Sequence, residues 1–64
     1  MPLREKVYGA VRIDDRNRRF IDISSLSVSL EVVNSNVERE ANVNPTWSRD
    51  NPVVEIKQFS INEL

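Results

Sequence analysis

Asp14 and Asp15 are adjacent in the sequence, and a pair of carboxylates can in principle share the general acid and general base work of catalysis. Both stand in a short polar segment with Arg16, Asn17 and Arg18, a composition typical of a solvated turn. The chain has no histidine and no cysteine, so it lacks the commonest general base and the strongest nucleophile. The sequence therefore predicts a protein that is not an enzyme and has no catalytic residues.

The same polar segment has a slight likeness to a calcium-binding loop, because Asp15 and Asn17 have the spacing of the first two ligands. Such a loop needs glycine at its sixth position and glutamate at its twelfth, where this chain has Leu26. Structural zinc needs cysteine or histidine, and a phosphate-binding loop needs more glycine than the single Gly9. We therefore expect neither a metal ion nor a cofactor.

Arginine is concentrated in the first third of the chain, at Arg12, Arg16, Arg18 and Arg19. Residues 1–19 carry a formal charge of +3 and residues 20–64 carry −4, although the net charge is only −1. An arginine hairpin flanked by aromatic residues can bind nucleic acid in a small β-barrel. The aspartates among these arginines weaken that field, so the sequence favours an acidic protein partner for Arg16, Arg18 and Arg19, or plain solvation, over nucleic acid.

Trp47 and Arg49 lie in a polar segment that follows Pro45. Tryptophan and arginine are the residue types that most often dominate protein interfaces. Trp47 either closes the open end of a thin core or anchors a partner, for example a target enzyme that this chain would inhibit. Both interpretations stay open from the sequence, and we count Trp47 and Arg49 as candidate partner-binding residues.

Residues 6–14 predict a first β-strand, with Val7, Val11 and Ile13 on one face and Tyr8, Ala10 and Arg12 on the other. Gly9 lies inside this predicted strand. A glycine at such a place usually marks a bulge, a bend or the close approach of another group.

Residues 14–18 are polar and predict a hairpin loop, after which residues 19–24 return as a second strand. The apolar positions then change from odd to even numbers. A shift of one residue needs a bulge or a corner, and we expect it at Ser24 and Ser25.

The next segment, residues 26–32, has apolar side chains on every second position and predicts a third strand. These side chains are Leu26, Val28, Leu30 and Val32. Residues 34–51 are rich in asparagine and predict a long irregular loop, in which the capping-box spacing of Ser35 and Glu38 could begin a single helical turn. A loop of this length usually binds something.

Residues 53–61 predict the last strand, with a second phase switch near Lys57 and Gln58. We expect this strand at an edge of the sheet, where Phe59 and Ile61 would contact a partner. The resulting fold class is all-β: a strongly twisted antiparallel sheet, or a partly open barrel, of about four strands. Residues 1–64 form a single small domain.

Sixty-four residues give a thin core, and neither a disulfide nor a metal site reinforces it. The sequence therefore favours a structural or interaction subunit of a repeating homo- or hetero-oligomeric assembly. The assembly that we name first, by general analogy, is a bacteriophage or virus particle with minor capsid or tail components of this kind. No apolar run is long enough to span a membrane and no secretory signal is visible, so we expect synthesis in the cytoplasm and no membrane partner.

Overall fold

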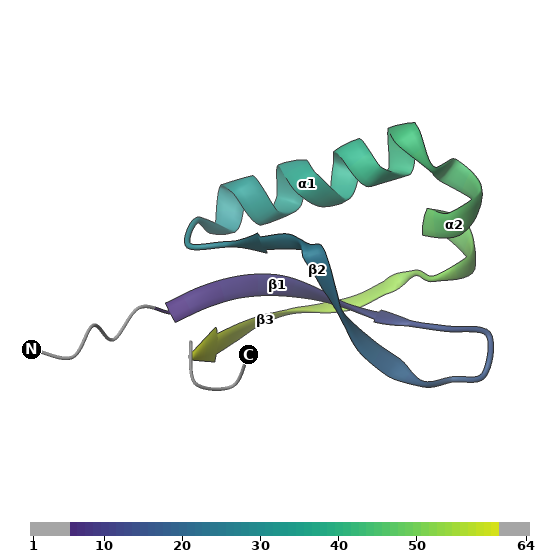
Figure 1. Cartoon of the computed structure of the whole chain (residues 1–64), viewed down its shortest axis with the longest axis horizontal. Coiled ribbons are helices and arrows are strands. Elements are labelled where there is room, and N and C mark those ends of the chain that lie inside the picture. Colours follow the sequence, from purple (N-terminus) through teal and green to yellow (C-terminus); the bar gives the residue numbers. More distant parts are fainter. Residues whose placement is uncertain (1–5, 61–64) are drawn as a thin grey trace, which may run out of the picture.

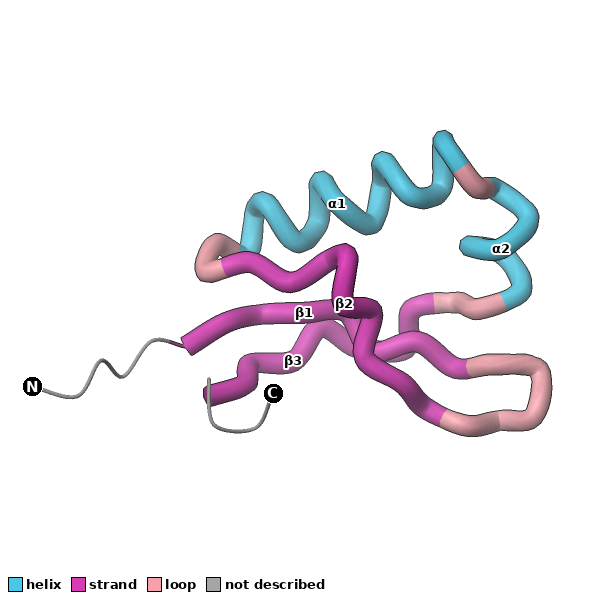
Figure 2. The backbone as a smooth tube through the Cα atoms, viewed as in Figure 1, coloured by secondary structure: helices cyan, strands magenta, loops and turns pink. Residues whose placement is uncertain are grey.

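The computed structural model describes residues 6–60, which form a three-stranded antiparallel sheet and a layer of helices on one of its faces (Figures 1 and 2). The strand order is β2-β1-β3. In chain order the elements are β1 (Lys6–Ile13), β2 (Arg19–Ser27), α1 (Leu30–Val43), α2 (Pro45–Asp50) and β3 (Val53–Ser60). The predicted small antiparallel β-rich fold is confirmed, but the described residues hold three strands rather than four, the sheet is open, and two helices replace an all-β architecture.

The predicted hairpin loop between β1 and β2 is confirmed. The backbone N–H of Asp14 donates to the carbonyl of Arg18 at 3.0 Å, and the N–H of Asn17 donates to the carbonyl of Asp14 at 3.1 Å. Asn17 has a φ of 61°, a left-handed conformation that asparagine adopts more readily than most residues. The Asp14 carboxylate also accepts the backbone N–H groups of Arg16 and Arg18, so one side chain organises the whole turn.

The predicted irregularity at Ser24 and Ser25 is also confirmed. Tyr8 pairs with Ser27 and Ala10 pairs with Asp22, so residues 23–26 of β2 stand opposite a single residue of β1. The Ser25 hydroxyl bridges this interruption: it accepts the N–H of Ala10 at 2.9 Å and donates to the carbonyl of Asp22 at 2.6 Å. At the bulge the N–H of Ala10 and the carbonyl of Asp22 therefore each keep a hydrogen-bond partner.

Gly9 lies opposite this bulge, and the predicted close approach is real. A Cβ built at Gly9 would overlap Leu26 Cδ2 and would touch Phe59 Cε2 at 3.5 Å. Glycine is thus favoured here because a Cβ would force the Leu26 side chain to shift, and not because of an unusual backbone angle.

The predicted strand over residues 26–32 is wrong, because β2 ends at Ser27 and α1 begins at Leu30. Ser29 is the N-cap residue, and its carbonyl accepts the N–H of Val33 at 3.1 Å. The helix buries Val33, while Asn36 and Glu40, three and seven residues later, occupy the same face as polar groups. Polar residues on the buried face conceal the helical period, so the alternation of four apolar residues dominated the sequence pattern.

The predicted irregular loop over residues 34–51 is wrong for the same reason. α1 continues to Val43 and α2 follows after Asn44, with Pro45 at the first helical position, where a missing N–H costs nothing. The helical turn expected from Ser35 therefore lies inside a helix that starts at Leu30. Tertiary contacts such as the hydrogen bond from Asn36 Nδ2 to the carbonyl of Ser25, at 3.2 Å, outweigh the low helix propensity of asparagine.

The last strand, β3, lies at an edge of the sheet as predicted. The predicted phase switch near Lys57 and Gln58 is wrong, since pairing with β1 runs in one register from Glu55 to Ser60. The irregularity falls instead between Val53 and Glu55. Apolar residues occur on both faces of this strand, and for this reason the sequence pattern resembles a phase switch.

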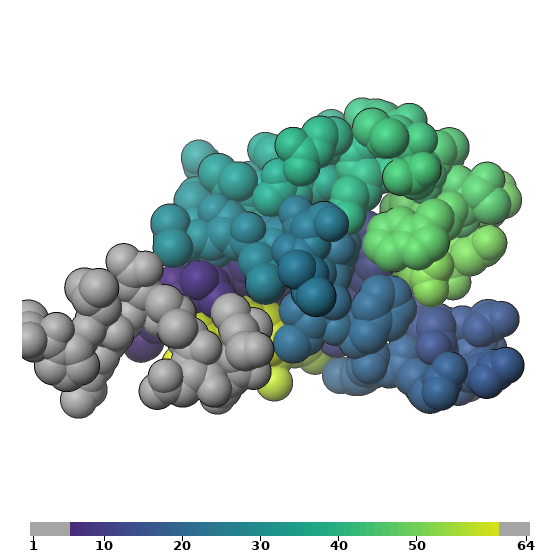
Figure 3. Space-filling model, in the orientation of Figure 1, coloured from purple at the N-terminus to yellow at the C-terminus, as the bar shows by residue number. Residues whose placement is uncertain are grey.

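Few hydrophobic residues are buried among residues 6–60. They are Ala10, Val11, Val33 and Phe59. The helices cover β2 and β1 and form the upper border of the molecule in Figure 3, so the opposite face of the sheet and much of β3 stay outside this layer.

Candidate functional site

Arg12 is the central polar residue of the molecule, with only 1% of its surface exposed. Its Nε donates to Asp22 Oδ2 at 2.9 Å, and its Nη2 donates to Glu40 Oε1 at 3.2 Å. Asp22 comes from β2 and Glu40 from α1, while Arg12 belongs to β1. One guanidinium thus joins two strands of the sheet to the helix that covers them.

The same guanidinium also holds α2. Its Nη1 donates to the carbonyl of Asn51 at 2.6 Å, and its Cζ lies 4.6 Å from the centre of the Trp47 ring. Trp47 keeps 40% of its surface exposed. The ring therefore packs over Arg12 while part of it faces solvent, and a role of Trp47 as an anchor for a partner stays a prediction.

Asp22 and Glu40 share the Arg12 cation, and this shapes the ionisation of Glu40. Burial raises the pKa of Glu40 above its ordinary value, and the neighbouring Asp22 carboxyl raises it further, while Arg12 acts in the opposite direction. The fold therefore favours a proton on Glu40 more strongly than the unfolded chain does.

A shallow cleft of about 380 Å³ opens beside this pair, lined by Asp22, Ser24, Glu40, Asn44 and Trp47. Both carboxylates already accept hydrogen bonds from Arg12, so their geometry is that of a structural ion network rather than of free ligands. In residues 6–60 no group of three histidine, cysteine, aspartate or glutamate side chains is placed to hold a metal ion.

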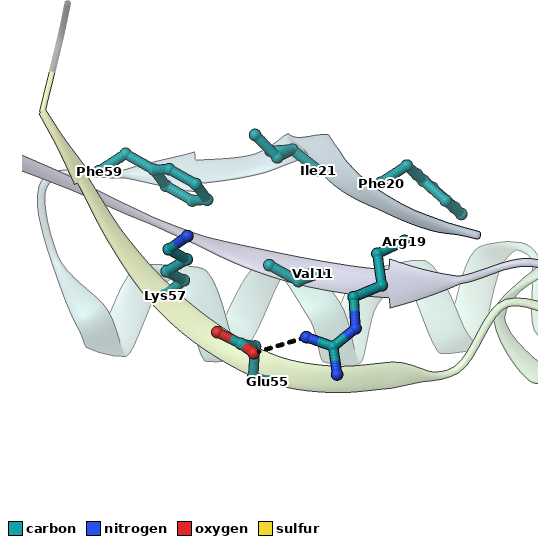
Figure 4. A pocket seen from close by; sticks show the side chains of 7 residues that line it. All are labelled: Val11, Arg19, Phe20, Ile21, Glu55, Lys57 and Phe59. Atoms are coloured by element: carbon teal, nitrogen blue, oxygen red, sulfur yellow. Dashed lines mark hydrogen bonds and ion pairs between the residues drawn. The ribbon is translucent and has the colours of Figure 1, made fainter. Parts of the chain in front are cut away.

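A second surface is the face of the sheet away from α1. A shallow groove of about 220 Å³ lies on this face. Figure 4 shows the side chains that line it, which are Val11, Arg19, Phe20, Ile21, Glu55, Lys57 and Phe59. An ion pair between Arg19 Nη1 and Glu55 Oε2, 3.1 Å apart, joins the two outer strands across the groove. The surface combines an apolar floor with charged groups at its border, which is the composition of a protein-binding patch.

Two of the three arginines of the predicted hairpin surface form ion pairs within the chain. Arg16 is exposed, Arg18 pairs with Asp14 at 3.3 Å, and Arg19 pairs with Glu55. Two of the three cations are therefore partly neutralised within the chain, which lowers support for a nucleic-acid-binding hairpin. Binding of an acidic protein partner at these residues stays a prediction.

The remaining candidate residues lie on separate surfaces. Arg49 is exposed in the last turn of α2, at the same end of the molecule as the hairpin loop (Figure 1). Phe59 is 5% exposed and borders the groove of Figure 4, so its ring serves the core first. Ile61 lies outside the described residues. The structure thus brings Trp47 close to Arg12 but does not gather the predicted set into one site.

The buried ion pairs of Arg12 with Asp22 and Glu40, here called the Arg12 network, are the main feature that the sequence interpretation missed. A signal was present, because Arg12 and Asp22 both stand inside predicted strands, where a charged residue on a packed face needs a partner. Glu40 could not be found in this way, since it was assigned to a loop.

No family model, no curated protein and no solved structure matches this chain. Within residues 6–60, neither helix has the length and apolar character needed to cross a membrane. Function must therefore be argued from the surfaces themselves.

Proposed function

We propose that this protein is a non-enzymatic subunit of a larger protein assembly and completes its apolar packing on neighbouring chains. The supporting observation is the balance between buried and exposed apolar residues. Four hydrophobic residues are buried among residues 6–60, whereas eight large hydrophobic side chains are at least 36% exposed. These eight are Ile23, Val28, Leu30, Val32, Val43, Trp47, Val54 and Ile56.

The length of the chain and the composition of its centre also support this proposal. A chain of this length buries only about 60% of the surface that its unfolded form exposes, and small domains usually need an additional source of stability. The Arg12 network occupies the centre where other proteins pack apolar side chains, and buried ion pairs contribute little net stability against such packing. Association with other chains is then the remaining source, because it favours the folded form by mass action.

Light scattering and thermal unfolding over a wide range of protein concentrations test the proposal. We expect either a mass above that of the 7.4 kDa chain with a melting temperature that rises with concentration, or an isolated chain that is poorly folded. A clean monomer with a cooperative melt that does not depend on concentration would overturn the proposal.

For the identity of the assembly, a bacteriophage or virus particle stays our first prediction. Detection of the chain among the proteins of purified particles supports it, and its absence from every such particle made by the cells that produce the chain contradicts it.

A further inference from the structure

We propose that two copies of this chain associate through their β3 strands, antiparallel and about a twofold axis at Ile56, so that the two sheets become one. This inference rests on the proposed function, because it names one neighbouring chain of the assembly. It also fixes the register: Glu55 of each copy stands opposite Lys57 of the other.

β3 is the better of the two sheet edges for such pairing. The other edge, β2, is interrupted where residues 23–26 bulge out opposite Gly9, and bulges protect an edge from strand addition. β3 runs in one uninterrupted register from Glu55 to Ser60, and no described strand pairs with its outer side. The outer backbone groups of a regular edge strand are suited to accept another strand.

The charges on β3 select the register. Glu55 and Lys57 are two residues apart and therefore project from the same face of the strand. Pairing centred on Ile56 places each carboxylate opposite an ammonium group, twice by symmetry. Moving the axis by one residue, to position 55 or 57, would instead oppose Glu55 to Glu55 or Lys57 to Lys57. Directly opposed like charges destabilise a strand pair.

The side chains of Glu55 and Lys57 are both accessible for ion pairs with the second copy. No carboxylate of the described residues lies within ion-pair distance of Lys57 Nζ, which instead lies 5.5 Å from the centre of the Phe59 ring. Glu55 pairs with Arg19 through Oε2, and 42% of its side chain is exposed. Figure 4 shows Glu55 and Lys57 on the face of the sheet that α1 does not cover.

The opposite face of β3 supplies apolar contact at the same axis. Ile56 is 36% exposed and Val54 is 43% exposed, since α1 packs against β2 and β1 rather than over β3. In the proposed register Ile56 meets Ile56 of the second copy, and side chains that stand directly opposite across an antiparallel pair are in contact. Charge pairing on one face and apolar pairing on the other thus indicate the same axis.

Charge reversal tests the register in the full chain. Glu55→Lys and Lys57→Glu, taken singly, each oppose like charges across the axis, and we expect at least a tenfold weaker dimer by light scattering and sedimentation. The double variant Glu55→Lys with Lys57→Glu restores opposite charges and should recover the dimer to within a few-fold. Glu38→Lys and Arg39→Glu on α1 change the net charge by the same amounts on exposed positions and should leave the dimer unchanged.

A cysteine at position 56 gives a second, independent measurement, since the chain contains no other cysteine. Ile56→Cys should form a disulfide between copies under mild oxidation, because the two Cβ atoms lie opposite each other at the axis. Val54→Cys and Gln58→Cys should crosslink efficiently only when the two variants are mixed, as these positions face each other in the proposed register.

The outcomes separate this inference from the proposed function. A dimer that is insensitive to both single charge reversals, or that crosslinks as well through either variant alone at 54 or 58, overturns the β3 register and leaves the proposed function standing. A poorly folded monomer at every concentration overturns the homodimer but supports a different neighbouring chain. A stable, self-sufficient monomer overturns both.

Discussion

The guanidinium of Arg12 lies 4.6 Å from the centre of the Trp47 ring and donates to the carbonyl of Asn51 at 2.6 Å. Arg12 belongs to the central strand. Trp47 lies in α2, and Asn51 follows α2 shortly before β3 begins. A single cation in the middle of the sheet therefore fixes the connection that brings the edge strand into place.

Replacing Arg12 by Met should destabilise the fold severely. The change leaves the Asp22 carboxylate, which is 5% exposed, without its cation, and breaking a buried pair in this way costs about 3–5 kcal/mol. Domains of this size have a total stability of about 3–10 kcal/mol, so we expect most of the free energy of unfolding to be lost. Urea unfolding followed by circular dichroism at a fixed protein concentration measures the change.

Two further variants show whether charge or shape is responsible. Arg39→Met removes an exposed cation from α1 and should change the free energy of unfolding by less than about 0.5 kcal/mol. Arg12→Lys keeps the charge but loses the planar contact with Trp47, so its stability should fall between those of the Met variant and the natural chain. An Arg12→Met variant as stable as the natural chain would refute a structural role for the network.

Glu40→Gln should alter how stability depends on pH. The folded chain raises the pKa of Glu40, so its contribution to stability is complete below the ordinary carboxyl range and is lost as pH rises through the raised pKa. Gln resembles the protonated side chain and does not titrate. The stability of the natural chain relative to the variant should therefore decrease as pH rises above the ordinary carboxyl range of about pH 4.

Chemical unfolding at closely spaced pH values, at one protein concentration, gives this difference. Glu38→Gln, on the exposed surface of the same helix, is the matched control and should show no such trend. A difference that increases with pH over this range would mean that the Arg12 cation dominates over burial and Asp22.

Asp14→Asn should show the opposite pH dependence. The backbone N–H of Arg18 is the main cause that lowers the pKa of Asp14, and the N–H of Arg16 and the Arg18 cation add to it against a smaller effect of desolvation. A carboxylate with a lowered pKa stabilises the fold above its ordinary pKa, and this contribution is lost as pH falls through the lowered value. The advantage of the natural chain over Asp14→Asn should thus shrink below about pH 4.

Asp15→Asn is the natural control here, because Asp15 lies in the same turn and its side chain is exposed. Nuclear magnetic resonance titration of the Asp14 carboxyl group provides a direct check. An Asp14 pKa at or above the ordinary value would show that the turn does not hold this carboxylate in the way described.

Short-range patterns in the sequence predicted the hairpin well. The loop over residues 14–18, the interruption at Ser24 and Ser25 and the close approach at Gly9 each follow from neighbouring residues, whose backbone requirements are local. The edge position predicted for the last strand also agrees with the strand order of the sheet.

The helices were not predictable by the same means. α1 docks through Val33, Asn36 and Glu40, and two of these three are polar groups whose partners, Ser25 and Arg12, are distant in sequence. The periodicity of apolar residues does not reveal a helical face that is held by hydrogen bonds and an ion pair. Identifying the Arg12 network needed the helix, so both were missed together.

Gly9→Ala should destabilise the fold through the Leu26 side chain. The added Cβ overlaps Leu26 Cδ2, and overpacking of this kind costs about 1–3 kcal/mol when the neighbour cannot move away fully. In a Leu26→Ala background the overlap is gone and only the ordinary contact with Phe59 Cε2 at 3.5 Å remains. There the same substitution should be neutral, or should stabilise by about 0.4–1 kcal/mol, because alanine restricts the unfolded chain.

A double-mutant cycle on these two positions, measured by urea unfolding at one protein concentration, isolates the interaction. Leu26→Ala alone is expected to cost stability as well, so the decisive quantity is the difference between the two effects of Gly9→Ala. If Gly9→Ala lowers the free energy of unfolding equally in both backgrounds, the steric conflict lies in the backbone of the bulge and not in the Leu26 side chain.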